Sequence, residues 1–196
     1  MRARRPLKIT SRTSSVANAF VQAILPVLES SESERAEALG ILGMTINTIC
    51  CAYCGATCTD WDHFRPLVRN GRPTGFMTEP RNLVPACGPC NQSKSGSDWR
   101  KWMDGNARGS PRARGVPDID GRIERLIAFE KWGDSLPQLF WEELVPQNLL
   151  DSHWNNLADI KERMHAAQRH ADLLRTAIQD ALERQRTSRH AGVVLT

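Results

Sequence analysis

Apolar residues near the start of the chain recur at the spacing of an amphipathic helix. In the segment 16–28 one helical face carries four of them: Phe20, Val21, Ile24 and Leu28. Pro26 disfavours the last turn of this helix. A second helix is expected over 32–42, because Ser31 or Ser33 supplies an N-cap in front of its apolar positions. Together the two helices predict a small helical hairpin.

The C-terminal part of the chain has the longest regular pattern. Its apolar residues follow alternating steps of three and four: Leu157, Ile160, Met164, Ala167, Ala171, Leu174, Ile178 and Ala181. This a/d pattern, sustained over about four heptads, predicts one long helix at about residues 155–187. Several of these residues are alanine, so a dimer seam and a helix packed on its own chain are equally supported.

A cysteine-rich segment and a linker lie between these helical ends. Residues 105–121 are rich in Gly, Pro and Arg, which predicts a connection without regular structure. Shorter helices are expected at 123–132 and 136–144. The predicted organisation has four parts: a basic arm with the helical hairpin (1–49), a central module (50–104), the linker (105–121) and a helical region (122–196).

Charge is concentrated in the middle of the chain. The net charge is +4, but the segment 63–114 alone holds ten basic and three acidic side chains. Most of the basic residues are arginine, whose planar fork suits phosphates and guanine edges. A localised basic patch is typical of surfaces that bind nucleic-acid backbones, although a solvated arginine-rich surface has the same composition.

The apolar residues of the chain never gather into a membrane-spanning segment. No run of about 18 or more of them is present, so no transmembrane helix is expected. The basic segment 1–15 continues with Ser and Thr residues instead of the apolar run of a signal peptide. These two observations predict a cytoplasmic protein.

All six cysteines fall between residues 50 and 90, and most of them form two CxxC pairs. The first pair is Cys51-Ala-Tyr-Cys54 and the second is Cys87-Gly-Pro-Cys90. Each pair fits a tight turn that aims two thiolates at one ion, so together they predict a closed, tetrahedral structural zinc site. A disulfide framework is disfavoured, because such frameworks belong to small secreted domains.

The two remaining cysteines, Cys50 and Cys58, lie beside the first CxxC pair. Cys50 offers an alternative ligand with CxxxC spacing, but the CxxC spacing of Cys51 mirrors that of the second pair. Cys51 is therefore the preferred ligand. Cys58 is interpreted as a small apolar residue of the interior, which is the common environment of a free cysteine.

Residues between and after the cysteine pairs complete a motif. They are Asp62-His63 shortly before Pro66, Asn82-Leu83 leading into the second pair, Asn91 directly after Cys90, and then Lys94. This combination resembles the HNH endonuclease family. The family pattern consists of a CxxC, an Asp-His followed by Pro, an Asn-Leu before a second CxxC, a His or Asn after its last Cys, and a Lys. The resemblance covers about residues 50–103.

The resemblance implies an α+β fold. A zinc-bound ββα-metal module is expected between mostly helical N- and C-terminal regions. One strand is expected near 57–63, and residues 82–85 are expected to lead into the other, with a loop over 65–80 between them. A helix over 91–103 should follow.

The resemblance also implies catalytic roles. His63 is the expected general base that removes a proton from the attacking water, a task suited to an imidazole near neutral pH. Asp62 and Asn91 are expected to hold Mg²⁺ or another divalent cation through hard oxygen ligands. Asn91 stands where many family members have His. Asn82 is expected to order the loop and orient the base.

Predicted DNA contacts lie within and after the module. They are Lys94, Arg65, Arg100, Lys101, Arg108, Arg112 and Arg114. Lys94 matches the terminal lysine of the family pattern and is expected to contact phosphate. The three arginines after residue 105 belong either to a plain tether or to an arm that orders against DNA. Trp99 and Trp102 are expected to pack in the core.

The function implied by the resemblance is metal-dependent hydrolysis of phosphodiester bonds in double-stranded DNA. A type II restriction enzyme acting as a homodimer is the favoured subtype, because helical additions flank the catalytic module and two copies suit a palindromic site. A phage or mobile-element HNH nuclease that nicks one strand is the alternative. A zinc-stabilised DNA-binding module without catalysis is the alternative of another class, and it would not require Asp62, His63 and Asn91 together.

Overall fold

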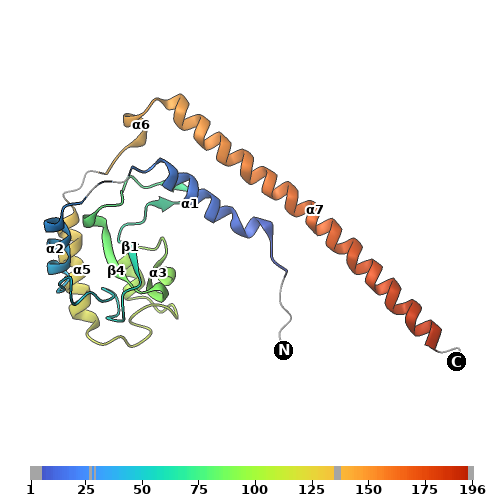
Figure 1. Ribbon diagram of the computed structural model, residues 1–196, viewed down its shortest axis with the longest axis horizontal. Coiled ribbons are helices and arrows are strands. Elements are labelled where there is room, and N and C mark those ends of the chain that lie inside the picture. Colours follow the sequence, from blue (N-terminus) through green and yellow to red (C-terminus); the bar gives the residue numbers. More distant parts are fainter. Residues whose placement is uncertain (1–5, 27, 29, 135–137, 194–196) are drawn as a thin grey trace. The chain divides into compact units, whose positions relative to one another are not determined.

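The chain folds into two compact units of helices and short antiparallel strands (Figure 1). A computed structural model describes residues 6–26, 28, 30–134 and 138–193. One unit combines Met1–Ala17 with Pro146–Thr196, and the other is Asn18–Val145. The predicted α+β class is confirmed. The short helix η1 (Ile9–Arg12) thus belongs to the same unit as the C-terminal helix.

The centre of the larger unit is a two-stranded sheet covered by a helix. Strand β1 (Asp60–His63) pairs antiparallel with β4 (Leu83–Ala86), and Asp62 lies opposite Val84. Helix α3 (Gly88–Lys94) follows β4 and packs against β1. This ββα order confirms the predicted strands within a few residues at each end.

The loop between β1 and β4 contains a small hairpin that the sequence did not predict. Strands β2 (Val68–Arg69) and β3 (Arg72–Pro73) pair antiparallel. Asn70 and Gly71 connect them, and both have positive φ values, 54° and 72°. Asn-Gly is the preferred dipeptide of a two-residue hairpin turn with this geometry. The turn dipeptide was visible in the sequence, but the flanking strands are too short to give a pattern.

The expected helix over 91–103 is two helices. The first, α3, ends at Lys94, and α4 (Trp99–Met103) begins after an interruption. Ser95 has a φ of 48°, which breaks the helical path. Asp98 then caps α4, because its side chain accepts a hydrogen bond from Lys101 N. The single-helix prediction is therefore wrong, and local capping chemistry explains the break.

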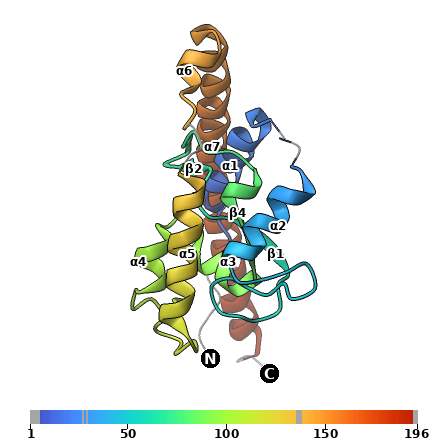
Figure 2. The same cartoon turned by 90° about the vertical axis from the view of Figure 1, so that its left-hand side faces the viewer.

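Two more helices of the larger unit follow the predictions closely. Helix α2 (Glu32–Ile41) begins with a capping box in which Ser31 and Glu34 bind each other's backbone N–H groups. It packs against α5 (Ile119–Gly133) and the short helix η2 (Pro80–Asn82) (Figure 2). The pairing with α5 replaces the expected hairpin with the preceding helix.

Helix α1 (Thr13–Ile24) begins earlier and ends earlier than expected. The helix ends two residues before Pro26. Proline lacks a backbone N–H and disfavours a helical conformation in the residue before it, so it favours an end at this point. Leu28 therefore lies outside the helix whose apolar face it was expected to extend. The last helix of this unit, α6 (Trp141–Leu144), covers only the end of the expected 136–144 stretch, whose first residues lie outside the described part of the chain.

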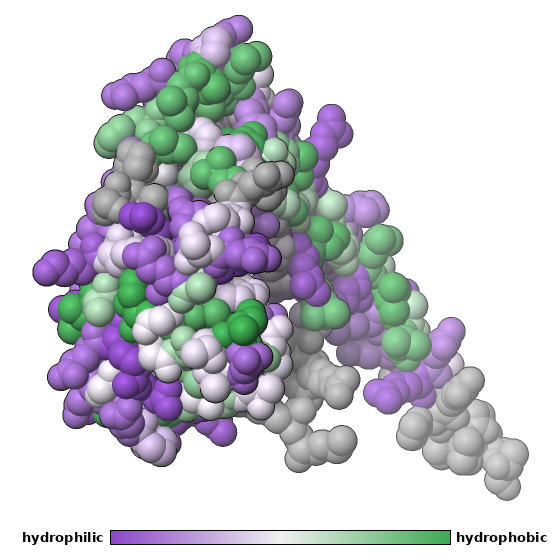
Figure 3. Space-filling model, turned by 60° about the vertical axis from the view of Figure 1, so that its left-hand side comes forward, coloured by the Kyte–Doolittle hydropathy of each residue, from purple (hydrophilic) through white to green (hydrophobic). Residues whose placement is uncertain are grey.

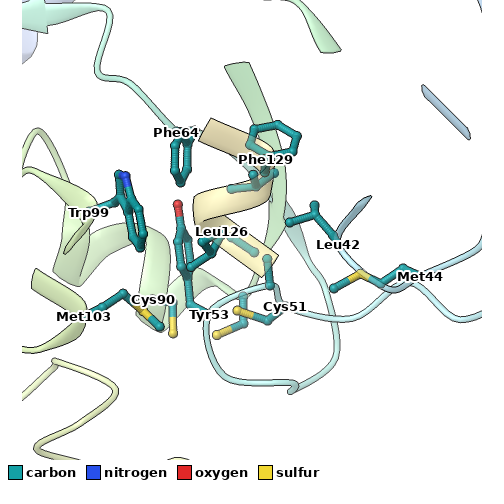
Figure 4. Close-up of a cluster of buried hydrophobic side chains, with 14 of the residues drawn as sticks. Leu42, Met44, Cys51, Tyr53, Phe64, Cys90, Trp99, Met103, Leu126 and Phe129 are labelled. Atoms are coloured by element: carbon teal, nitrogen blue, oxygen red, sulfur yellow. The ribbon is translucent and has the colours of Figure 1, made fainter. Parts of the chain in front are cut away.

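An aromatic core joins the sheet to the helices. Phe64 lies 5.3 Å from Phe129 of α5 and 5.1 Å from Trp99 of α4, measured between ring centroids. Tyr53 meets Trp102 edge to face at 5.1 Å. Figure 4 shows Tyr53, Phe64, Trp99 and Phe129 around Leu126, with the sulfur atoms of Cys51 and Cys90 at one border of the cluster. Burial of Trp99 and Trp102 confirms the core role predicted for them.

The segment 105–121 is packed instead of forming a free tether. Ser110 is fully buried, and its hydroxyl donates to the carbonyl oxygen of Met103 over 3.1 Å. Pro111 is buried beside it. Arg112 N donates to the same Met103 carbonyl oxygen over 3.2 Å. Buried backbone polar groups need such partners, so this segment has a defined path that its composition did not reveal.

The smaller unit is organised on one long helix. Helix α7 (Gln147–Val193) packs against the short helix η1 (Ile9–Arg12), and Ile9 N donates to Gln168 Oε1 over 2.6 Å. Leu157 of the predicted seam is buried. Farther along, Leu174 and Ile178 are more than half exposed, and hydrophobic residues appear on the surface of α7 (Figure 3). Among the described helices, none is both long and apolar enough to cross a membrane.

Candidate functional site

Four cysteines from two turns meet at one point. The Sγ atoms of Cys51, Cys54, Cys87 and Cys90 all lie within 4.8 Å of one another. The first turn closes with a hydrogen bond from Gly55 N to the carbonyl oxygen of Cys51, and Gly55 has a φ of +75°, which glycine adopts without strain. Among the described residues, these four cysteines are the group of side chains placed closely enough to hold a metal ion. Four sulfur donors fit the tetrahedral ligand set of a structural zinc.

The cluster is fixed to the sheet by its backbone. Ala52 N, inside the first turn, donates to the carbonyl oxygen of Pro85 on β4 over 2.8 Å. The second turn follows β4 directly and starts α3. Cys50 and Cys58 stay outside the cluster, as predicted, although Cys58 is only half-buried and its thiol donates to the carbonyl oxygen of Asp60. A zinc ion held there would tie both ends of the β1–β4 insert together.

Asp62 is buried beneath α3 with two donors on the same oxygen. The Tyr53 hydroxyl donates to Asp62 Oδ2 over 2.6 Å, and Lys94 Nζ lies 2.9 Å from that atom. Lys94 also donates to the backbone carbonyl oxygen of His63 over 2.9 Å. Its side chain is fully buried, so the predicted contact between Lys94 and phosphate is wrong. The last turn of α3 faces β1, which directs Lys94 into the interior.

Tyr53 links the two parts of the site, and the sequence analysis missed it. Its ring lies beside the sulfur atoms of Cys51 and Cys90, while its hydroxyl points away from them (Figure 4). Burial, followed by the charge of Asp62, raises the pKa of Tyr53 well above its usual value, so it stays a neutral donor. Its position inside the first CxxC, as the single tyrosine of the chain, was the available signal.

His63 ends β1 with one ring nitrogen already engaged. Its Nε2 lies 2.9 Å from Thr78 Oγ1, a partner from the loop that sequence reasoning did not identify. Burial lowers the pKa of His63, and Lys94 adds to this effect while Asp62 opposes it. A lowered pKa keeps the imidazole neutral near pH 7. In the tautomer in which Nε2–H donates to Thr78 Oγ1, Nδ1 retains the lone pair that can accept a proton.

Asn82 is fully buried and uses both ends of its amide. Its Oδ1 accepts from Arg65 N over 2.7 Å, and its Nδ2 donates to the carbonyl oxygens of Arg65 and Met77, each over 3.0 Å. These three hydrogen bonds fix both ends of the loop that starts two residues after His63. Asn82 therefore acts on the chain around the site and does not reach its surface.

Asn91 belongs to helix α3, which packs against β1. It precedes Lys94 by three residues, a spacing that places both side chains on one helical face. Asn91 is half-buried, whereas Lys94 is buried. The half-buried amide of Asn91 thus lies about one helical turn before the buried ammonium group of Lys94, which pairs with Asp62.

The predicted DNA contacts differ in their availability. Arg65 is largely buried, donates to the carbonyl oxygen of Glu130 over 2.9 Å and pairs with Asp134, so its guanidinium is engaged within the domain. Arg112 pairs with two aspartates and Arg114 donates to a cysteine sulfur, while Arg100 pairs with Glu130. Two basic residues of the predicted set are exposed and have no ion pair among the described residues: Lys101 and Arg108.

Comparison with known proteins covers the part of the chain that contains this geometry. The family model of the HNH endonuclease matches residues 51–97. No curated protein and no solved structure matches the chain. The match begins at the first zinc-site cysteine and ends just after α3, so it includes both CxxC turns, the β1–β4 sheet and His63. Residues 51–97 are therefore an HNH endonuclease domain, built around a cluster of four cysteines.

Proposed function

We propose that this chain is a metal-dependent DNA endonuclease in which His63 is the general base. The observation that carries the proposal is the hydrogen bond between His63 Nε2 and Thr78 at the end of β1. It orients the ring and leaves Nδ1 to remove a proton from a water molecule that attacks phosphorus. The lowered pKa keeps this nitrogen unprotonated at neutral pH. Asn82 supports the geometry by fixing the loop that carries Thr78.

Asp62 and Asn91 provide the oxygen ligands for the catalytic cation in this proposal. Tyr53 and Lys94 both bind Oδ2 of Asp62, so Oδ1 is the oxygen left for a metal ion. Carboxylate and amide oxygens are hard donors and fit Mg²⁺. A divalent cation bound by them would stabilise the negative charge that develops on the phosphate and on the leaving oxygen. Lys94 holds Asp62 in place and tethers the backbone of His63.

Replacing His63 by alanine tests the catalytic role. We expect plasmid cleavage with Mg²⁺ to fall by about 10²- to 10⁴-fold, the usual contribution of a general base. His165 of α7 is exposed, so His165→Ala is a matched control that should cleave like the parent. Circular dichroism would verify that both variants fold. Equal cleavage by His63→Ala and the control contradicts the proposal, and a parent that binds DNA without cutting it would support the non-catalytic module instead.

A restriction enzyme acting as a homodimer is the finer form of this proposal. In the first half of the predicted seam on α7, Leu157 is buried, whereas Ile160 is exposed. Among the described residues of its second half, Leu174 and Ile178 are each more than half exposed, and the adjacent Leu182 is exposed as well. Exposed leucine and isoleucine at heptad spacing are typical of a helix that pairs with a second copy.

Charges on the exposed half of α7 test the dimer. We expect the parent to elute as a dimer in size-exclusion chromatography with light scattering, and Ile178→Glu to elute as a monomer, since a seam carboxylate would be desolvated without a partner. Gln179→Glu introduces the same charge on the neighbouring position and should leave the dimer intact. A monomeric parent contradicts dimerisation through α7 and favours the alternative of a nuclease that nicks one strand.

A further inference from the structure

Arg114 belongs to the segment expected to be a linker, yet its side chain ends on the cysteine cluster. Its Nη1 donates to Cys90 Sγ over 3.3 Å. The same guanidinium also interacts with Cys54, which comes from the other CxxC turn. One cation therefore binds Cys90 of the second turn and lies near Cys54 of the first. Arg114 lies beyond the residues matched by the HNH family model, so the match does not account for this contact.

The charge of the cluster explains why a cation belongs there. Four thiolates around one Zn²⁺ carry a net charge of about −2. A second guanidinium, that of Arg122, lies over Gly55 at the end of the first CxxC turn. It is so close that a Cβ added to Gly55 would overlap it. Hydrogen bonds from a charged donor to an ionised acceptor are stronger than neutral ones. Arg114 thus offsets part of a charge that the cysteines alone leave uncompensated.

The path of the chain on both sides of Arg114 is fixed. We call residues 105–117 the strap. Its Ser110 is buried, and Arg112 forms ion pairs with Asp104 on one side and Asp120 on the other, at 2.7 and 2.8 Å. Arg122 Nε donates to the carbonyl oxygen of Pro117 at the end of the strap. Arg114 lies between these anchors, where it contacts the metal ligands.

We propose that Arg114 is a positioning residue of the zinc cluster, and that zinc binding and the ordering of the strap are coupled through it. The guanidinium stabilises the negatively charged, zinc-loaded cluster, and the loaded cluster in turn holds the strap against the domain. Because binding couplings are reciprocal, loss of either partner weakens the other. The strap therefore extends the zinc site beyond its four ligands and connects it to α5.

Zinc affinity provides the first test. We expect competition with a chromophoric chelator to show about 10- to 100-fold weaker zinc binding in Arg114→Ala, the usual effect of removing a partner of a metal ligand. Arg108→Ala is the matched control, since Arg108 is exposed in the same strap, and it should bind zinc like the parent. Arg114→Lys keeps the charge without the fork and should lie between them. Unchanged zinc affinity in Arg114→Ala overturns the proposal.

Order of the strap provides the second test, at saturating zinc. Trypsin cuts after arginine, and we expect the strap of zinc-loaded parent protein to resist cleavage after Arg108 and Arg112. Arg114→Ala, loaded with zinc and folded by circular dichroism, should be cut faster at these positions. If Arg114→Ala does not fold, Arg114→Lys replaces it in both measurements. If the folded variant binds zinc and resists trypsin like the parent, the contact between Arg114 and Cys90 positions neither the cluster nor the strap, and the proposal is wrong.

Discussion

Replacing Cys90 by alanine is expected to unfold the HNH domain. Its sulfur is buried in the cluster beside Cys51, and the remaining three thiols cannot close a tetrahedral site. Structural zinc contributes about 10–16 kcal/mol in zinc-finger peptides, which is comparable to the whole stability of a typical domain, about 5–15 kcal/mol. The β1–β4 sheet that joins the ends of the insert is short, with four residues in each strand.

Thermal unfolding followed by circular dichroism, together with zinc content by mass spectrometry, checks this expectation. Cys58→Ser is the matched control, because Cys58 lies outside the cluster and a hydroxyl can also donate to the carbonyl oxygen of Asp60. The control should retain zinc and melt like the parent. A Cys90→Ala variant with parent-like melting would show that the four cysteines are ordinary core residues without a metal.

Lys94→Met is expected to destabilise the domain by about 3–5 kcal/mol, because it leaves the charge of Asp62 buried without its partner. Methionine matches the length of lysine, so packing changes little. Tyr53 would remain the single donor to Asp62 Oδ2. Lys94 also holds the backbone of His63, so cleavage should decrease in the fraction that stays folded.

Urea unfolding of Lys94→Met and of the control Lys101→Met compares the loss of a buried, paired lysine charge with the loss of an exposed one. Lys101 is exposed on α4, and its substitution should change the free energy of unfolding by less than about 0.5 kcal/mol. The double variant with Asp62→Asn should recover part of the lost stability, because it removes the unpaired charge. Equal stability of the two lysine variants would contradict the buried ion pair.

The spacing of residues in the sequence predicted the chemical groups of the site, but not the burial or the hydrogen-bond partners of those groups. The CxxC pairs and the Asp-His and Asn positions are local signals, and the structure places them on two turns, β1 and α3. Lys94 was assigned to phosphate because it matches the terminal lysine of the family pattern, and a sequence does not show which helical face is buried. Tyr53 and Thr78 were missed for a related reason, since hydrogen bonds across the fold have no fixed spacing along the chain.

For the fold, too, local features could be predicted from the sequence and long-range contacts could not. The capping box at Ser31 and the strand pairing were predictable, because they depend on neighbouring residues or on a motif. The break between α3 and α4 depends on one backbone angle at Ser95 and on the cap at Asp98, within a stretch whose composition allows a continuous helix. The packed strap depends on partners far along the chain. Composition rich in Gly, Pro and Arg describes a free tether equally well.

The hydrogen bond between Ile9 and Gln168 has a consequence for the order of folding during synthesis. These residues are 159 positions apart in the chain. Ribosomes add about 5–20 residues per second, so Ile9 must wait roughly 8–30 seconds for its partner to be made. The unit Asn18–Val145 lies wholly between the two segments and is complete before α7 is finished. The HNH domain can therefore bind zinc and fold first, while the basic N-terminal segment of the nascent protein is still unpaired.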